Sequence, residues 1–144
     1  MRLEVTRKSD LAVRALIELG AERDRSTLPL KGSDLGDRVS TTGGFLAQVM
    51  TPLVRAGWVR SDPGPSGGYS LVADLAEVSV LAVIEEIEGP TDNGQCVLVD
   101  RPCNESGQCA LHPAWMRARN EMLVELTRLS VADAQAMSAD ITRA

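Results

Sequence analysis

Residues 41–72 read TTGGFLAQVMTPLVRAGWVRSDPGPSGGYSLV, and the fold class can be inferred from this segment. Four apolar residues in its first half recur at the spacing of one helix face: Leu46, Val49, Met50 and Leu53. They predict a helix behind the Thr/Gly-rich turn, which Pro52 is expected to kink or end because its ring clashes with the carbonyl four residues back. Two short β-type runs, 58–60 and 69–72, flank a turn rich in Pro and Gly and predict a hairpin.

Two helices are predicted before this stretch. The first is expected to begin at Asp10, with Ser9 as its cap, and to end at Gly20 ahead of a polar loop over 21–30. The second is short, is capped by the Ser-Asp pair at 33–34, and runs through position 38. Three helices followed by a hairpin is the order of a winged helix-turn-helix, so the predicted fold is mostly α with a small β-hairpin wing.

The second half of the chain is expected to be helical around a loop. Ser79 should cap a helix over 80–88, and the stretch 89–109 has no periodicity and holds all three cysteines. Pro113 suits the first turn of a long helix that runs to about Leu129, and an Ala-rich tail should form a short helix. We therefore divide the chain into three regions: a winged region 1–76, a connecting helix and cysteine loop 77–111, and a long helix with tail 112–144.

Composition narrows the class of protein. The chain has 144 residues, of which 44% are hydrophobic, enough for one domain with a moderate core. No run approaches eighteen apolar residues and the N-terminus does not resemble a secretion signal, so we expect a cytoplasmic protein with reduced cysteines and no membrane partner. No Gly-rich nucleotide loop and no Ser/His/Asp set is present, so we do not expect an enzyme.

The charge is distributed unevenly along the chain. The formal net charge is −5, but residues 1–72 hold ten Lys/Arg and eight Asp/Glu, a net +2, whereas residues 73–144 hold five and twelve, a net −7. The acidic half can stay away from DNA while the mildly basic half approaches it. This distribution permits DNA binding without demonstrating it.

A winged helix-turn-helix inserts the N-terminal end of its third helix into the major groove. The residues expected there, facing base edges or phosphates, are Thr41, Thr42, Gly43, Gly44 and Gln48. In the wing, Ser66 and Gly67 are expected to bring backbone N–H groups to phosphates, and Arg60 is expected to reach the backbone or the minor groove. The alternative is a small helical domain whose surface hairpin touches no nucleic acid.

The cysteines follow the pattern Cys96-x6-Cys103-x5-Cys109-x2-His112. A loop without a packed core needs something to organise it, and a metal centre bound by thiolates would do so. Structural zinc usually takes closely spaced Cys pairs, so the wider gaps favour an iron–sulfur cluster, with zinc and free or redox-active thiols as alternatives. His112, the only histidine, is either a further ligand or a helix cap ahead of Pro113.

The chain resembles the IscR/NsrR-type iron–sulfur winged-helix transcriptional regulators over nearly its whole length. The resemblance rests on the three-cysteine loop and on five further segments: 1–3, 9–16, 45–48, 53–57 and 64–71. It implies a cluster-dependent regulator, expected to be a repressor, that binds a dyad-symmetric DNA operator as a homodimer. The chain departs from the family pattern at Pro63, before the wing glycine, and at Ala47, in the third helix. The operator sequence therefore does not carry over from the family.

The resemblance offers two fourth ligands for the cluster. Cys96, Cys103, Cys109 and His112 look like the family's 2Fe–2S set, which points to iron or redox sensing. Asp10 looks like the aspartate that a partner subunit lends to a 4Fe–4S cluster, which points to nitric oxide sensing; otherwise it is a first-turn helix acid. Both residues are present, so the choice stays open, with 2Fe–2S slightly favoured.

The resemblance also implies that the long helix pairs with its copy in the dimer. Apolar residues follow 3-4-4-3 spacing along it: Trp115, Ala118, Met122, Leu126 and Leu129. The alternative is that this stripe packs on the chain's own core. In the dimer, a change at the cluster would move the loop and the start of the long helix. That movement would change the spacing of the two third helices, which are the helices expected to enter the DNA major groove.

Overall fold

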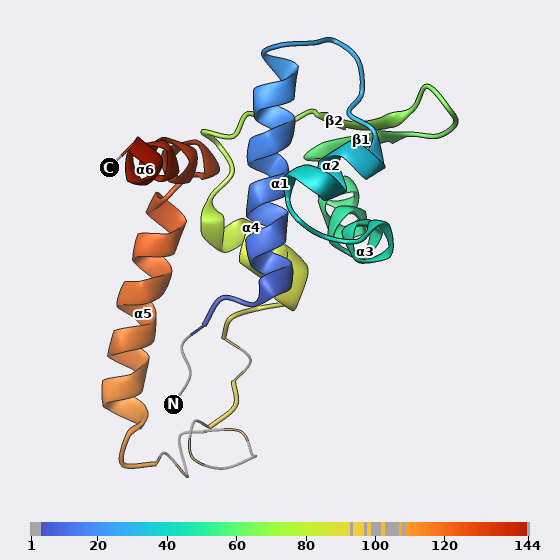
Figure 1. Ribbon diagram of the computed structural model, residues 1–144. Coiled ribbons are helices and arrows are strands. Elements are labelled where there is room, and N and C mark those ends of the chain that lie inside the picture. The colour runs from blue at the N-terminus through green and yellow to red at the C-terminus, as the bar shows by residue number, and fades with distance from the viewer. Residues whose placement is uncertain are drawn as a thin grey trace.

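The computed structural model describes residues 4–92, 94–96, 98, 102, 107 and 109–143, and the side chains of these up to Ser138. Eight elements follow in order: α1 (Arg7–Arg23), α2 (Gly32–Arg38), α3 (Gly43–Arg55), β1 (Val59–Asp62), β2 (Gly68–Leu71), α4 (Val80–Glu88), α5 (His112–Arg128) and α6 (Val131–Arg143). Figure 1 shows α1 in the middle, with α2, α3 and the hairpin on one side and α5 and α6 on the other. This mostly helical arrangement with one hairpin confirms the predicted fold class.

Helix α1 begins earlier and ends later than the sequence indicates. Thr6 is its N-cap, because the Thr6 hydroxyl oxygen accepts a hydrogen bond from the Ser9 backbone N–H at 3.2 Å. Ser9 lies inside the first turn, fully buried, so the prediction of Ser9 as the cap was wrong. Gly20 does not end the helix either. It is buried against Leu75, and a Cβ there would lie 2.9 Å from that side chain, so the glycine permits close packing.

Helices α2 and α3 meet at the helix-turn-helix turn. The N-cap of α2 is Lys31, which makes no side-chain capping bond, so the predicted Ser-Asp cap at 33–34 was wrong. In α3 the Thr42 oxygen accepts from the Phe45 N–H at 3.3 Å and caps the helix. Pro52 is buried within α3, which continues to Arg55, so the expected termination at the proline does not occur.

The wing is a two-stranded antiparallel sheet in which Val59 pairs with Leu71 and Asp62 pairs with Gly68. Leu30 adds a bridge to it through reciprocal backbone bonds with Tyr69, at 2.9 and 2.8 Å. Gly68 has φ of 151°, and a Cβ at this position would lie 2.2 Å from the Leu30 carbonyl oxygen. Only glycine fits where the hairpin passes the chain ahead of α2.

The hydrophobic core is formed mainly by the winged region. Helices α1, α2 and α3 supply most of its large, fully buried side chains: Leu11, Leu16, Leu19, Leu35, Leu46, Met50 and Leu53. Each such side chain contributes about 1.5–3 kcal/mol relative to an exposed one. The hairpin closes the core with Val59 and Leu71, and α4 closes it with Val83.

The helices after the wing attach to this core at several places, because α4 packs on α1 and α3, α5 packs on α4, and α6 packs on α1. Ser79 caps α4 as predicted, accepting from the Ala82 N–H at 3.0 Å. The joint between α5 and α6 bonds to the segment ahead of α4, with Val131 donating to the Val78 carbonyl at 2.9 Å, and Val131 is fully buried. By contrast, no residue of α5 is buried. None of the helices in the described part of the chain has the length and apolar character needed to cross a bilayer.

Candidate functional site

The N-terminal end of α3 presents the residues that the sequence assigned to DNA. Gly43 and Gly44 are exposed, with open space where a side chain would be, and Gln48 is exposed one turn further along. The Thr42 oxygen is engaged in capping the helix, and Thr41 is half-buried with its N–H bonded to the Gly36 carbonyl at 2.9 Å. Backbone N–H groups and polar side chains at a helix N-terminus suit contact with phosphates and base edges.

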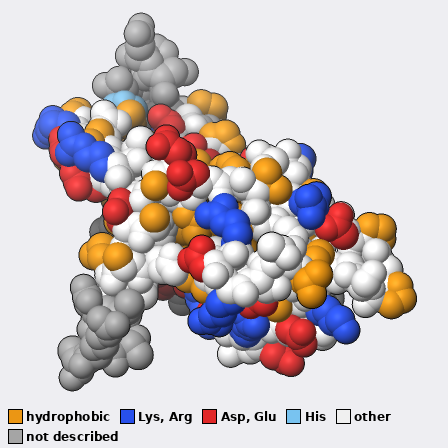
Figure 2. Space-filling view, turned by 90° about the horizontal axis from the view of Figure 1, so that it is seen from above, with side chains coloured by type: hydrophobic (Ala, Val, Ile, Leu, Met, Phe, Trp, Pro, Cys, Tyr) orange, Lys and Arg blue, Asp and Glu red, His pale blue; other side chains and the backbone are white. Residues whose placement is uncertain are grey.

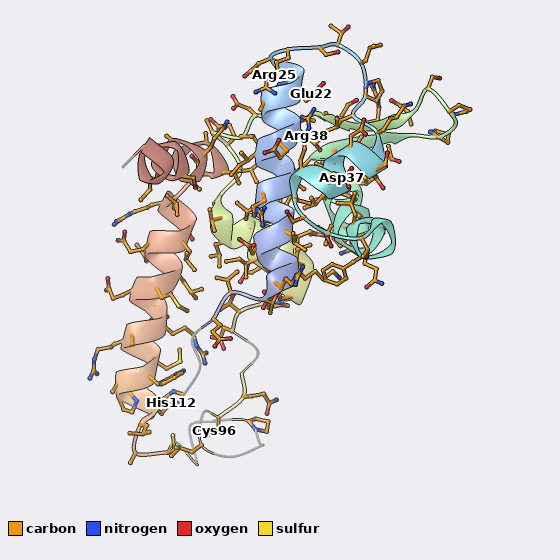
Figure 3. All side chains as sticks on the ribbon, in the orientation of Figure 1. Glu22, Arg25, Asp37, Arg38, Cys96 and His112 are labelled. Atoms are coloured by element: carbon orange, nitrogen blue, oxygen red, sulfur yellow. The ribbon has the colours of Figure 1, made fainter. Side chains whose placement is uncertain are left out.

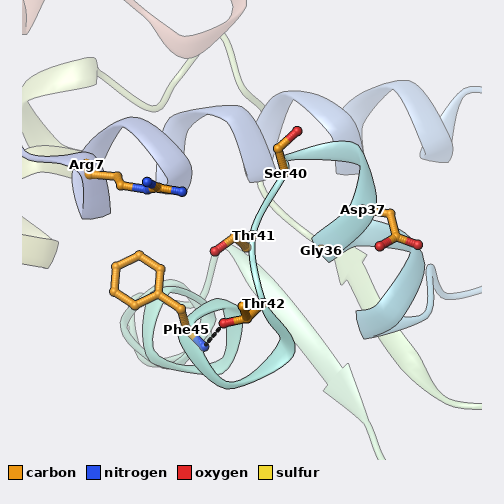
Figure 4. Close-up of a pocket in the computed structure, with 7 residues that line it drawn as sticks. All are labelled: Arg7, Gly36, Asp37, Ser40, Thr41, Thr42 and Phe45. Atoms are coloured by element: carbon orange, nitrogen blue, oxygen red, sulfur yellow. Dashed lines mark hydrogen bonds between the residues drawn. The ribbon is translucent and has the colours of Figure 1, made fainter.

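An open cavity of about 620 Å³ lies beside this end of α3 (Figure 4). Its lining residues come from α1, from the α2–α3 turn and from α3: Arg7, Gly36, Asp37, Ser40, Thr41, Thr42 and Phe45. The sequence reasoning missed Arg7 and Phe45. No local signal marks Arg7, because the predicted helix begins only at Asp10 and Arg7 enters the first turn of α1 only in the structure.

The wing offers less free positive charge than expected. The Arg60 Nε lies 3.1 Å from the Asp62 carboxylate, so this cation is already paired on the same strand. Ser66 is exposed at the turn. Gly67 is buried, its N–H donates to the Gly64 carbonyl at 3.0 Å, and a Cβ would lie 2.0 Å from the Asp62 carbonyl oxygen. Gly67 therefore fixes the shape of the turn, and its N–H has a partner there.

Acidic partners neutralise other arginines of the winged region as well. Arg38 lies 2.9 Å from Glu22, both labelled in Figure 3, and Arg55 at the end of α3 lies 2.6 Å from Glu86 of α4. On the face drawn in Figure 2, basic and acidic side chains of the described residues alternate without one continuous basic patch. The surface charge of this region is thus mixed, as its small net charge indicates.

The cysteine loop and the start of α5 enclose a second cavity, of about 180 Å³. We call this the thiol cavity, because Cys96, Cys109 and His112 all line it, together with Trp115 of α5. Figure 3 shows Cys96 and His112 at the same end of the molecule, at the foot of α5. His112 is the first residue of α5 and Leu111 is the N-cap, so His112 is not the helix cap.

The chemistry of this donor set suits a metal centre. Cys96, Cys109 and His112 bring two cysteine sulfurs and an imidazole to one cavity, and these are donors that iron–sulfur centres and zinc accept. Cys103, the third predicted ligand, lies outside the described residues. Among the residues that are described, no three potential ligands are already in metal-binding positions. Asp10 does not line the thiol cavity; it is exposed in the first turn of α1, 3.8 Å from Arg14.

The last turn of α4 connects the two sites. The Glu88 carboxylate accepts from the hydroxyls of Thr6, at 2.7 Å, and of Ser9. Partial burial raises the pKa of Glu88, but the hydrogen bonds from Ser9 and Thr6 outweigh that effect and hold it below its ordinary value of 4.5. Glu85, one turn earlier, accepts from the Thr91 N–H at 3.1 Å. The start of α1 and the start of the cysteine loop are therefore both bound to one turn of helix.

Comparison with known sequences places the chain among transcription regulators. Residues 5–136 match the Rrf2 family model, described as an iron-dependent transcriptional regulator. The IscR regulator of Vibrio vulnificus strain YJ016 is 30% identical over 113 residues, which cover 78% of this chain and 66% of that protein. The IscR regulator of Serratia proteamaculans strain 568 is 27% identical over 131 residues, or 91% of this chain and 78% of that one.

Solved structures share the fold. CymR, the global cysteine regulator of B. subtilis, superposes with a TM-score of 0.75 at 24% identity, covering 94% of this chain and 98% of that one. T. potens IscR gives 0.70 at 20% identity, covering 94% and 88%. These likenesses confirm the winged helix-turn-helix, and the matched family and the named relatives are regulators and not enzymes, in agreement with the sequence. The chain belongs to the Rrf2 family of transcriptional regulators.

Proposed function

We propose that this Rrf2-family chain is an iron–sulfur-dependent DNA-binding repressor that acts as a homodimer. The observation that supports it most is that Cys96, Cys109 and His112 line one cavity at the start of α5. The start of the cysteine loop is bonded to α4 through Thr91 and Glu85. Helix α4 is in turn bonded to the winged region through Glu88 and Thr6. Nothing in this arrangement requires the chain to catalyse a reaction.

The proposed ligands are Cys96, Cys103, Cys109 and His112. A bound cluster would supply a charge centre that responds to iron supply, redox state or nitric oxide. The position of His112 on the thiol cavity of its own chain favours the 2Fe–2S assignment. The 4Fe–4S alternative needs the partner's Asp10, because Asp10 of this chain is exposed on α1 and paired with Arg14.

The proposed DNA interface is the N-terminal end of α3 together with the wing. Gln48 and the exposed glycines at 43–44 would meet base edges, while Thr41 and Thr42 would meet phosphates. Arg7 adds a cation beside the same helix end. In the wing, Ser66 would approach the backbone and Gly67 would hold the turn in shape. Arg60 would have to leave Asp62 before it could bind a phosphate.

The proposed dimer interface is α5. This helix has no buried residue, and Met122, in the middle of its apolar stripe, is 38% exposed. A cavity of about 330 Å³ between α4 and α5 is lined by Ile84, Met122 and Leu126 among others. Pairing α5 with its copy would cover this apolar surface, which one chain alone leaves open to water.

A direct test varies the ligands and measures what the protein holds. The chain is purified and reconstituted without oxygen, and its iron, inorganic sulfide and visible absorbance are measured. Alanine at Cys96, Cys103 or Cys109 should each abolish the absorbance. His112→Ala and Asp10→Ala then identify the fourth ligand, since only the true ligand's variant should lose or change the spectrum. If the triple-alanine variant kept the colour of wild type, the ligand set would be wrong.

A second candidate is a thiol-based regulator without a cluster. It is favoured by the position of Cys96 and Cys109 on the same cavity. In that case the reconstituted protein would hold no sulfide, and mild oxidation would join two cysteines reversibly and change DNA affinity. Structural zinc would instead give a colourless protein with bound zinc, which metal analysis separates from both.

A further inference from the structure

Arg119 is a charged residue of the thiol cavity that the cysteine pattern does not reveal. It lies on α5, two turns after His112, and lines the same cavity as Cys96 and Cys109. Only 12% of its side chain is exposed. Arginine is seldom so buried unless it is paired, because removing a guanidinium from water costs free energy.

The partner of Arg119 is Asp92, at the start of the cysteine loop. The Arg119 Nη1 lies 2.7 Å from an Asp92 carboxylate oxygen, which also accepts the Gly94 N–H at 3.1 Å. One carboxylate thus ties α5 to the turn just before Cys96. Asp92 is 49% exposed, whereas Arg119 is nearly enclosed. The negative charge of the pair is therefore better screened by water than the positive charge, and the cavity keeps a net positive influence.

We propose that Arg119 is a positioning and charge-balancing residue for the group held in the thiol cavity. The inference rests on the proposed function. Three thiolates and a neutral imidazole around iron and sulfide make an anionic centre, and each added electron makes it more negative. A nearly buried cation on the same wall favours the more negative form. Among the described lining residues, Arg119 is the one lysine or arginine that could do so.

Removing the charge of Arg119 and removing that of Asp92 should shift the midpoint potential of the bound centre in opposite directions. A purely structural role of the pair does not predict opposite shifts. Arg119→Gln removes the cation and should move the midpoint potential of the reconstituted centre to more negative values. We expect at least a tenfold change in the reduction equilibrium, about 59 mV for a one-electron couple. Asp92→Asn removes the anion and leaves the cation, so it should move the potential to more positive values. Arg119→Lys keeps the charge and should stay close to wild type.

Arg117→Gln is the matched control, because Arg117 is an exposed arginine on the same helix that does not line the cavity. It should leave the potential unchanged. The inference is overturned if Arg119→Gln holds a centre with the wild-type potential, or if the Asp92 and Arg119 variants shift in the same direction. If Arg119→Gln holds no iron, the lysine variant decides: normal iron and sulfide in Arg119→Lys supports the need for charge, and their loss in a folded protein overturns it. A wild-type protein without iron and sulfide would instead refute the proposed function itself.

Discussion

The winged region and the cysteine region of this chain are built in opposite ways. Helices α1 and α3 each bury several large apolar side chains completely, whereas α5 buries none and contacts the start of the loop before it through the ion pair of Asp92 with Arg119. A segment with few buried contacts opens at low free energy, so it can respond to a ligand while the packed region keeps its shape. In the proposed regulator, this division would separate the part that reads DNA from the part that senses.

The largest effect should come from the packed region. Leu16 of α1 is fully buried, and Leu16→Ala should lower the free energy of unfolding by about 2–5 kcal/mol because it leaves a cavity. Met122 on α5 is 38% exposed, so Met122→Ala should lower the free energy of unfolding of the monomer far less. Urea unfolding of the cluster-free protein measures both. Equal losses for the two variants would erase the contrast between the regions.

The next effect concerns DNA and should leave stability alone. Gln48→Ala should weaken binding to an operator fragment, selected from genomic DNA by the reconstituted protein, by about 1–3 kcal/mol. The reason is that an exposed amide that reads a base edge is lost. Fluorescence anisotropy at fixed salt measures the affinity. Glu77→Ala, at an exposed position outside α3 and the wing, is the control and should bind as wild type does. Unchanged affinity in Gln48→Ala would remove this residue from the interface.

A smaller effect joins the two regions through Glu88. Since its pKa is lowered in the folded chain, the ionised form stabilises the fold above pH 4.5, and that contribution is lost as the pH falls below 4.5 through the folded pKa. Glu88→Gln should therefore be less stable than wild type at neutral pH, and the difference should shrink in acid. Thermal unfolding from pH 7 to pH 3 tests this. Glu121→Gln, exposed on α5, should show no such convergence.

The smallest effect on folding free energy concerns the N-cap of α3. Thr42→Ala should cost about 1 kcal/mol of folding free energy, because the Phe45 N–H loses its partner, while Thr42→Ser should restore most of it. Chemical denaturation of the three proteins gives the values. If the serine variant were as unstable as the alanine variant, the hydroxyl would not be the group that matters.

Local signals in the sequence were enough for α3, α4 and the hairpin, because each has its cap, period or turn within a few residues. The start of α1 was placed wrongly because Thr6 and Ser9 are both capping residues three positions apart. The cap is Thr6, because its hydroxyl oxygen accepts the Ser9 N–H, whereas Ser9 is buried inside the first turn and donates its own hydroxyl to Glu88, 79 residues later. Gly20 was read as a helix end for a similar reason, since Leu75 determines its role.

The candidate site divides in the same way. The spacing of the cysteines and His112 pointed to one site, and the structure places Cys96, Cys109 and His112 on one cavity. No local pattern joins Asp92 to Arg119, because the two are 27 positions apart and meet only when α5 packs beside the loop. Arg7 likewise reaches the end of α3 only through the packing of α1. Long-range pairing of polar residues is what sequence periodicity does not contain.

Cluster-dependent DNA binding is tested by the affinity of one operator fragment for the same protein before and after its cluster is removed. Genomic DNA selected by the reconstituted protein supplies the fragment, and both measurements use one salt concentration. For a cluster-dependent regulator, we expect dissociation constants that differ by at least about tenfold, or 1.4 kcal/mol. Equal constants for the two forms, with iron and sulfide present in one and absent from the other, would contradict cluster dependence.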